Sequence, residues 1–160
     1  MENESTDEAK REVVVSRLID GPRRLVFRAY TSAEHVAHWW GPAGFSITTQ
    51  SFEFRPGGEW LFVMHGPDGV DYPNWVRWLE IEEPSRIVLL HGAHVDDPAS
   101  FTSFISFVEV DGRTELTMRA LFKTQAQRDE VVERYGAIEG GRQTLQRLAD
   151  YLAAHGGELT

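Results

Sequence analysis

The clearest hydrophobic pattern in the chain lies near its C-terminal end, over residues 138–154. Apolar or small residues recur there every three or four positions, so they share one face of a helix. Polar and charged residues occupy the opposite face. The spacing predicts one long amphipathic helix with inward positions Ile138, Gly141, Leu145, Leu148 and Leu152. Such a helix is expected to lie across a sheet formed by the preceding strands, and the question for function is whether helix and sheet leave a cavity between them.

The alternation typical of strands runs through residues 45–122. Turn-forming residues interrupt this alternation and predict six strands in an antiparallel meander. The interruptions lie at residues 55–58, 66–69, 83–85, 93–100 and 111–112. A β-branched run over residues 12–19 predicts one more strand ahead of the meander.

Helical spacing returns on either side of the meander. Two short helices are expected over residues 22–30 and 31–39. Thr31 and Thr124 are each followed three positions later by Glu or Gln, which is the form of a capping box. The second box predicts a short helix that ends at Tyr135. The expected fold is therefore α+β, with an antiparallel sheet of about seven strands wrapped around a long C-terminal helix.

The length of 160 residues suits one domain. Residues 1–11 are polar and acidic and predict a flexible tail, and residues 12–156 form the predicted single domain. The chain contains no cysteine, which excludes disulfides, thiolate metal sites and cysteine nucleophiles.

Charge and hydropathy limit the range of possible binding partners. A formal net charge of −9 argues against nucleic acid or an anionic membrane as a partner, because both attract basic surfaces. The N-terminus has no apolar core for a signal peptide, and no apolar run approaches the ~20 residues of a membrane span. We therefore expect a cytoplasmic protein.

Several segments together resemble one family. They are DGPRRLVFRAYTSAEHVAHWWGPAGF, FEFRPGGEW, MHGPDG, WLEIEEPSRIV, GRTELTM and the closing GRQTLQRLADYL. Their order and spacing resemble those of the activator of heat shock protein 90 ATPase homologue-like domains, which belong to the START-like (SRPBCC) superfamily. The resemblance covers about residues 12–154 and implies the helix-grip fold. One departure is Gly141, at a position of the last helix where many members carry Trp.

The resemblance implies a hydrophobic ligand-binding cavity between the sheet and the C-terminal helix. It implies little about chemistry, because the superfamily includes lipid carriers, plant hormone binders, polyketide cyclases and a co-chaperone domain.

The candidate cavity residues are mostly aromatic, since flat rigid side chains form apolar pockets; ordinary core packing is the alternative for about half of them. The full set is Trp39, Trp40, Phe54, Trp60, Phe62, Met64, Trp78, Glu80, Phe104, Met118, Gly141, Leu145 and Leu148. Trp39 and Trp40 are adjacent at a helix end, so we expect only one of them to point inward. Gly141 indicates space on the gripping helix, either for a ligand or for a neighbouring aromatic ring.

Glu80 is the one ionisable residue in this set. It follows Trp78 in an apolar strand, where burial would raise its pKa and make it a polar anchor or a general acid. The alternative, which we favour, is an ion pair with an Arg on the neighbouring strand or a position facing water.

The histidines do not form a metal motif. The pairs His35/His38 and His91/His94 lack an HExxH arrangement and a third ligand, so neither a metal nor another cofactor is expected. No nucleophile elbow, phosphate-binding loop or dinucleotide fingerprint is present.

Three functions remain open. The favoured hypothesis is binding of a small hydrophobic or aromatic molecule, in stress response or metabolite handling, without catalysis. The alternatives are an enzyme of the cyclase or hydratase type that uses the same cavity, and a module that interacts with a chaperone. The sequence leaves a homodimer open.

Overall fold

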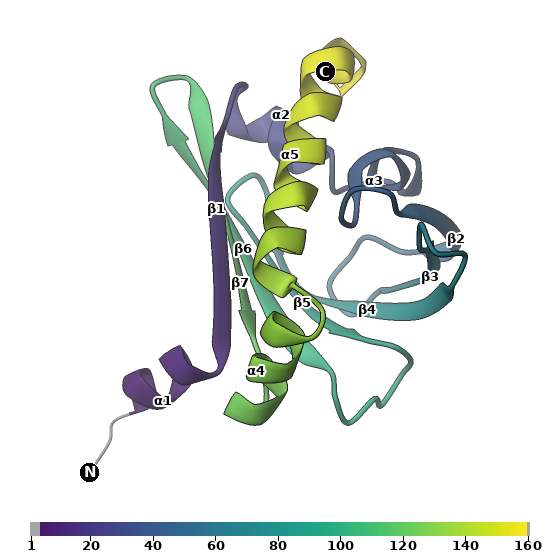
Figure 1. Cartoon of the computed structure of the whole chain (residues 1–160). Coiled ribbons are helices and arrows are strands. Elements are labelled where there is room, and N and C mark those ends of the chain that lie inside the picture. The colour runs from purple at the N-terminus through teal and green to yellow at the C-terminus, as the bar shows by residue number, and fades with distance from the viewer. Residues whose placement is uncertain (1–3, 160) are drawn as a thin grey trace.

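The structure, a computed structural model, describes residues 4–159. A seven-stranded antiparallel sheet forms one layer, and helix α5 (Ala137–His155) crosses its inner face (Figure 1). The predicted α+β class and helix-grip arrangement are thus confirmed. Within the described residues, no helix has both the length and the apolar character needed to cross a membrane.

The strands follow the predicted meander. They are β1 (Glu12–Ile19), β2 (Ser46–Phe52), β3 (Glu59–His65), β4 (Asp71–Glu82), β5 (Arg86–Gly92), β6 (Phe101–Val110) and β7 (Arg113–Leu121). Their order in the sheet is β1-β7-β6-β5-β4-β3-β2, so every strand pairs with its neighbour in sequence except β1, which pairs with the last strand. Asp111 and Gly112 both have positive φ, at 51° and 79°, as a tight two-residue hairpin turn requires.

Two short helices, α2 (Arg23–Arg28) and α3 (Ala33–Trp39), follow β1 as predicted. The capping residue of α3 differs from the prediction: Ser32, not Thr31, accepts a hydrogen bond from the His35 backbone N–H at 3.2 Å. Thr31 instead donates to the Arg28 carbonyl at the end of α2. The predicted cap at Thr124 is confirmed, and it begins α4 (Gln125–Glu133). A 3-10 turn, η1 (Gly156–Leu159), follows α5.

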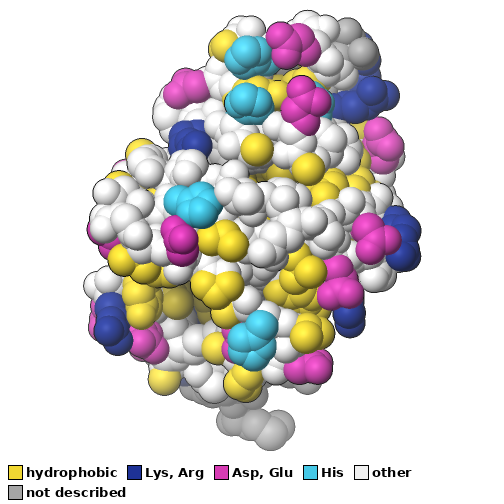
Figure 2. Space-filling model, turned by 90° about the vertical axis from the view of Figure 1, so that its right-hand side faces the viewer, with side chains coloured by type: hydrophobic (Ala, Val, Ile, Leu, Met, Phe, Trp, Pro, Cys, Tyr) yellow, Lys and Arg dark blue, Asp and Glu magenta, His cyan; other side chains and the backbone are white. Residues whose placement is uncertain are grey.

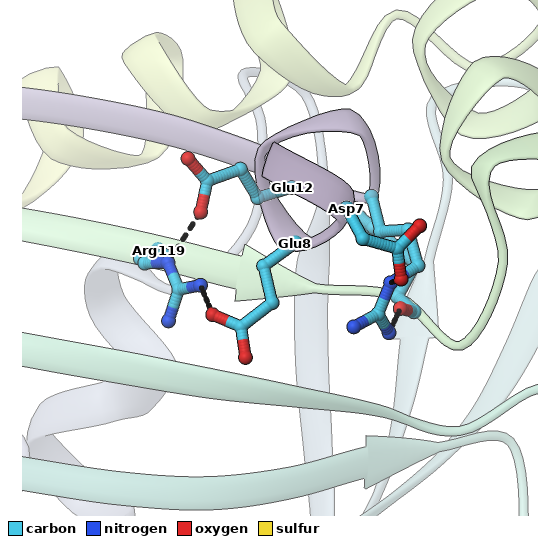
Figure 3. Close-up of polar contacts among 6 residues, drawn as sticks. Asp7, Glu8, Glu12 and Arg119 are labelled. Atoms are coloured by element: carbon cyan, nitrogen blue, oxygen red, sulfur yellow. Dashed lines mark hydrogen bonds and ion pairs between the residues drawn. The ribbon is translucent and has the colours of Figure 1, made fainter. Parts of the chain in front are cut away.

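The sequence did not predict a helix before β1, yet residues Glu4–Lys10 form α1. Figure 3 shows how it is attached: Glu8 of α1 and Glu12 of β1 both bind Arg119 of β7. These carboxylates raise the pKa of Arg119, chiefly through the hydrogen bond with Glu12. The first part of the predicted tail, residues 1–3, lies outside the described residues.

The inner face of the sheet is filled unevenly along α5. At one end, Leu145, Leu148 and Leu152 of α5 are buried against a cluster of large aromatic side chains. This cluster, which we call the aromatic core, consists of Phe27, Tyr30, Phe54, Trp60, Trp78 and Phe107. Towards its N-terminal end, α5 presents small residues to the sheet, and this is where the fold is hollow.

Candidate functional site: an apolar cavity between the sheet and α5

A cavity of about 280 Å³ lies between the sheet and the N-terminal half of α5. Five strands, the loop after α3 and the first turns of α5 contribute to its wall. The face in Figure 2 shows hydrophobic side chains gathered in its lower half, where the surface is hollowed, with acidic and histidine side chains among them. The volume is near the lower end of the ~300–1,000 Å³ range of ligand pockets, so the cavity suits a small molecule.

The strand wall consists of residues that alternate along each strand. Leu89 and His91 of β5 border the cavity, and Ser103 and Ile105 lie beside them on β6. Side chains on a strand alternate between the two faces of the sheet. Residues two positions apart, such as Leu89 and His91, therefore point to the same face. On β7 the residues that border the cavity are Met118 and Ala120, and the small side chain of Ala120 leaves space that a larger residue would fill.

The helix wall is made of small residues. Ala137, Gly140, Gly141 and Thr144 of α5 border the cavity. Gly141 also permits close approach to β1, since a Cβ at this position would come within 3.0 Å of Val15 Cγ2. The neighbour that Gly141 accommodates is therefore Val15 of β1, not the aromatic ring that the sequence left open.

The rim at the end of α3 is held by Arg147 of α5. Its Nη1 donates to the carbonyl oxygens of Trp40, Gly41 and Pro42, at 3.1, 2.9 and 3.1 Å. Burial lowers the pKa of this guanidinium. Gly41 has a φ of 96°, a backbone conformation that favours glycine at this bend.

Trp39 and Trp40 both turn inward, so the expectation that only one could do so was wrong. Trp39 is fully buried and its Nε1 donates to the Ala29 carbonyl at 3.1 Å. Trp40 follows the last helical residue and has an extended ψ of 133°. The rotation between successive helical residues therefore does not govern its side chain, which packs edge-on against Trp60, with ring centroids 4.8 Å apart.

The predicted cavity residues divide into three groups. The structure brings five of them to the cavity wall: Trp39, Trp40, Met64, Met118 and Gly141. Six others fill space elsewhere in the core: Phe54, Trp60, Phe62, Trp78, Leu145 and Leu148. These six make the dense packing beside the cavity, including Trp60 stacked on Phe62 with ring centroids 3.8 Å apart. Glu80 and Phe104 lie on the outer face.

The placement of Glu80 in the cavity is corrected by a β-bulge. The pairing of β4 with β5 shifts between Trp78 and Glu80, so these two residues do not share a face as simple alternation predicts. The side chain of Glu80 is 52% exposed and pairs with Arg86 of β5 at 3.6 Å. The alternative that the sequence favoured, an ion pair with an Arg on the neighbouring strand, is the arrangement observed.

Phe104 is also corrected. On β6 the inward residues are Phe101, Ser103, Ile105 and Phe107, and Phe104 has the opposite parity. The guanidinium of Arg119 lies 5.1 Å from the centre of its ring. Phe104 therefore supports the ion-pair cluster of Figure 3 from the outer face of the sheet.

His35 and His38 connect α3 to α5. His35 Nδ1 hydrogen-bonds the Tyr151 hydroxyl at 2.7 Å, and the ring of His38 stacks on Tyr151 at 5.2 Å. Within residues 4–159, no three His, Asp or Glu side chains come together as a group that could hold a metal ion. The contacts of these histidines are thus those of a packing interface.

His91 is a polar cavity residue that the sequence did not identify as one. It was considered as a metal ligand with His94, but its Nε2 contacts Asn74 Oδ1 at 2.7 Å and its ring borders the cavity. Burial lowers the pKa of His91 to about 4, although the carboxylate of Asp97 acts in the opposite direction. The imidazole is therefore neutral at neutral pH. Its alternation with Ile87 and Leu89 along β5 was the signal available in the sequence.

Comparison with known proteins points to one family. The family model described as activator of Hsp90 ATPase homolog 1-like protein matches residues 20–153. A search of curated proteins finds no match to the chain.

Solved structures agree with this match. A protein from Nitrosomonas europaea is 27% identical, with a TM-score of 0.84 over 93% of this chain and 98% of that one. A protein from Arthrobacter aurescens is 23% identical, with a TM-score of 0.83 over 92% and 89%. An AHSA1 protein from Silicibacter pomeroyi is 21% identical, with a TM-score of 0.72 over 90% and 99%, and these last two likenesses concern the fold.

Proposed function

The chain belongs to the activator of Hsp90 ATPase homolog 1-like family, and from this and the cavity we propose that it binds a small, uncharged hydrophobic molecule between the sheet and α5. The observation that carries the proposal is the cavity of about 280 Å³ in an otherwise densely packed inner face. The proposed biological role is metabolite handling or stress response in the cytoplasm.

Small residues around the cavity support this function. Ala120, Ala137 and Gly140 all border the space, although a larger side chain at any one of them would reduce it. Protein interiors are normally packed as densely as organic crystals, and a hollow forgoes the dispersion contacts that would fill it. A bound ligand would supply those contacts.

The character of the wall favours binding over acid–base catalysis. Apart from His91, the described residues that border the cavity include no Asp, Glu, Lys or Arg. A hydratase or cyclase that moves protons needs at least one group poised to give or take them at the operating pH. With a pKa of about 4, His91 is a weak base at neutral pH and offers no proton as an acid.

Native mass spectrometry of the protein purified from its own cells tests the proposal. We expect a co-purifying small molecule that solvent extraction releases, and Ala120→Leu should abolish this extra mass because the leucine fills the cavity. A parent protein that carries no ligand and also fails to take up uncharged naphthalene probes in titration would contradict the proposal. A chaperone-interaction module, by contrast, would keep its function in Ala120→Leu.

A further inference from the structure

Two polar side chains, His91 and Ser103, interrupt the apolar strand wall of the cavity, and they lie next to each other. His91 of β5 pairs with Phe101 of β6, and Leu89 pairs with Ser103. His91 and Ser103 are therefore diagonal neighbours on the inner face of the sheet, within reach of one small ligand. Both border the cavity.

The proton position on His91 follows from its contact with Asn74 on β4. The Asn74 amide nitrogen Nδ2 donates to the Tyr72 carbonyl at 2.9 Å, so its Oδ1 is the atom turned to His91 Nε2, at 2.7 Å. An amide oxygen can only accept, so Nε2 must carry the ring proton. In a neutral imidazole the other nitrogen, Nδ1, is then an acceptor with a free lone pair.

This acceptor has no partner among residues 4–159. Among the described residues, His91 Nδ1 makes no hydrogen bond, and neither does the Ser103 hydroxyl. Since Nε2 is fixed on Asn74, the remaining polar edge of the ring is available to a molecule in the cavity. Burial also keeps this ring neutral, because it lowers the pKa of His91 to about 4.

We propose that His91 determines the specificity of the cavity: its Nδ1 accepts a hydrogen bond from a hydroxyl or N–H group of an otherwise apolar, uncharged ligand, such as a phenol or an aromatic alcohol. This inference rests on the proposed binding function. A hydrocarbon or an ether of the same shape leaves Nδ1 buried without a partner, which costs affinity. A carboxylate brings a buried charge and an acceptor to a wall that offers it no cation.

Three probes of one shape test the assignment: 2-naphthol donates a hydrogen bond, 2-methoxynaphthalene cannot, and 2-naphthoate is charged. We would measure the Kd of each by NMR titration at pH 7 with the parent protein and with His91→Phe, which keeps a ring but removes the acceptor. The matched control is His94→Phe, an exposed histidine outside the cavity wall, and Ser103→Ala tests the neighbouring hydroxyl as the alternative partner of the ligand.

The parent should bind 2-naphthol about five- to tenfold more tightly than the ether, as expected for one hydrogen bond, and should bind the carboxylate most weakly. In His91→Phe this preference should fall to about one while the affinity for the ether is retained. His94→Phe should keep the preference. Equal binding of naphthol and ether by the parent, or a preference lost in Ser103→Ala instead, would overturn the role of His91 and leave the proposed function standing.

Failure of all three probes to bind the parent saturably would refute the proposed function and this inference together. The parent protein alone gives a second test, which is needed if His91→Phe does not fold. The ¹⁵N resonances of the His91 imidazole should show a proton on Nε2, and the Nδ1 resonance should move when 2-naphthol is added but not when the ether is added. A protonated Nδ1, or an Nδ1 resonance that ignores 2-naphthol, would overturn the assignment.

Discussion

The two ends of α5 lie against the same sheet, but one is densely packed and the other borders a cavity. From Leu145 onward, α5 packs Leu145 and Leu148 into the aromatic core, where both are essentially inaccessible. The N-terminal half presents Gly140 and Gly141, and a cavity of about 280 Å³ remains beside them. One helix therefore has two kinds of packing: its large residues fill the space against the sheet, and its small residues border the cavity that we propose as the ligand site.

The aromatic core also contains buried polar groups. The Tyr30 hydroxyl and the Trp78 indole nitrogen are buried without a hydrogen-bond partner among the described residues. Burial raises the pKa of Tyr30 well above its ordinary value, so the hydroxyl stays protonated. Each unpaired donor costs roughly 1–3 kcal/mol, which extensive aromatic packing must offset.

Truncation of a side chain should give the largest difference in stability between the packed end of α5 and the cavity end. Leu148→Ala removes a fully buried side chain from the packed half, and we expect a loss of about 2–5 kcal/mol in unfolding free energy. Met118→Ala, at the half-buried cavity wall, should cost about 1 kcal/mol because the site already borders empty space. Denaturant titrations of both variants measure this, and equal losses would remove the distinction between the halves.

Replacement of an alanine by a larger residue should destabilise the packed region but not the cavity. Ala29 is fully buried beside the aromatic core, so Ala29→Leu should overpack it and cost about 1–3 kcal/mol. Ala120→Leu places the same added volume in the cavity and should leave stability level or higher while it abolishes probe binding. Thermal unfolding of the two variants, with probe titration, decides the matter; an Ala120→Leu variant that binds the probe normally would locate the ligand elsewhere.

The pH dependence of stability should report on His91. Burial lowers its pKa from about 6.5 to about 4, so the unfolded chain binds a proton first as the pH falls. The stability contributed by the neutral ring is therefore complete above pH ~6.5 and is lost progressively down to pH ~4. Between pH 7 and pH 5 the parent should lose about 1–2 kcal/mol more than His91→Phe does. His94→Phe should follow the parent, and identical pH profiles for the parent and His91→Phe would show that the imidazole is not buried in a neutral form.

Glu80 should have the smallest effect. Glu80→Gln breaks an exposed pair with Arg86 on the outer face, and such pairs contribute about 0–1 kcal/mol. Probe affinity should not change, because a bulge turns this side chain away from the cavity. An altered Kd for the naphthalene probes would contradict the outward placement of Glu80.

The sequence could predict the fold because the signals that define it are local. Helical spacing in α5 and the turn at Asp111 and Gly112 depend on neighbouring residues, and both appear as predicted. The cap of α3 at Ser32 instead of Thr31 shows the usual uncertainty of one residue at a helix end.

The cavity could be predicted only in part. Its wall depends on which residues of each strand face inward, and the hydrophobic pattern alone does not determine this. One inserted residue between Trp78 and Glu80 reverses the parity of the end of β4. On β6, Phe104 and Ile105 are adjacent and both apolar, so the sequence allowed either of them to face inward. The burial of Ile105 and Phe107 shows that Ile105 is the inward residue. A cavity is the space that side chains leave unfilled. The large aromatic residues therefore indicated the densely packed region, and the small residues indicated the cavity.

One titration tests most directly whether the hollow half of α5 is the ligand site. Uniformly ¹⁵N-labelled parent protein and Ala120→Leu would be titrated with 2-methoxynaphthalene, and backbone amide shifts followed. We expect saturable shifts in the parent at Ser103, Ala120 and Ala137, unchanged amides at Leu148 and Phe107, and no saturable shifts in Ala120→Leu. Shifts centred on Leu148 and Phe107, or equal titrations of both proteins, would contradict the account.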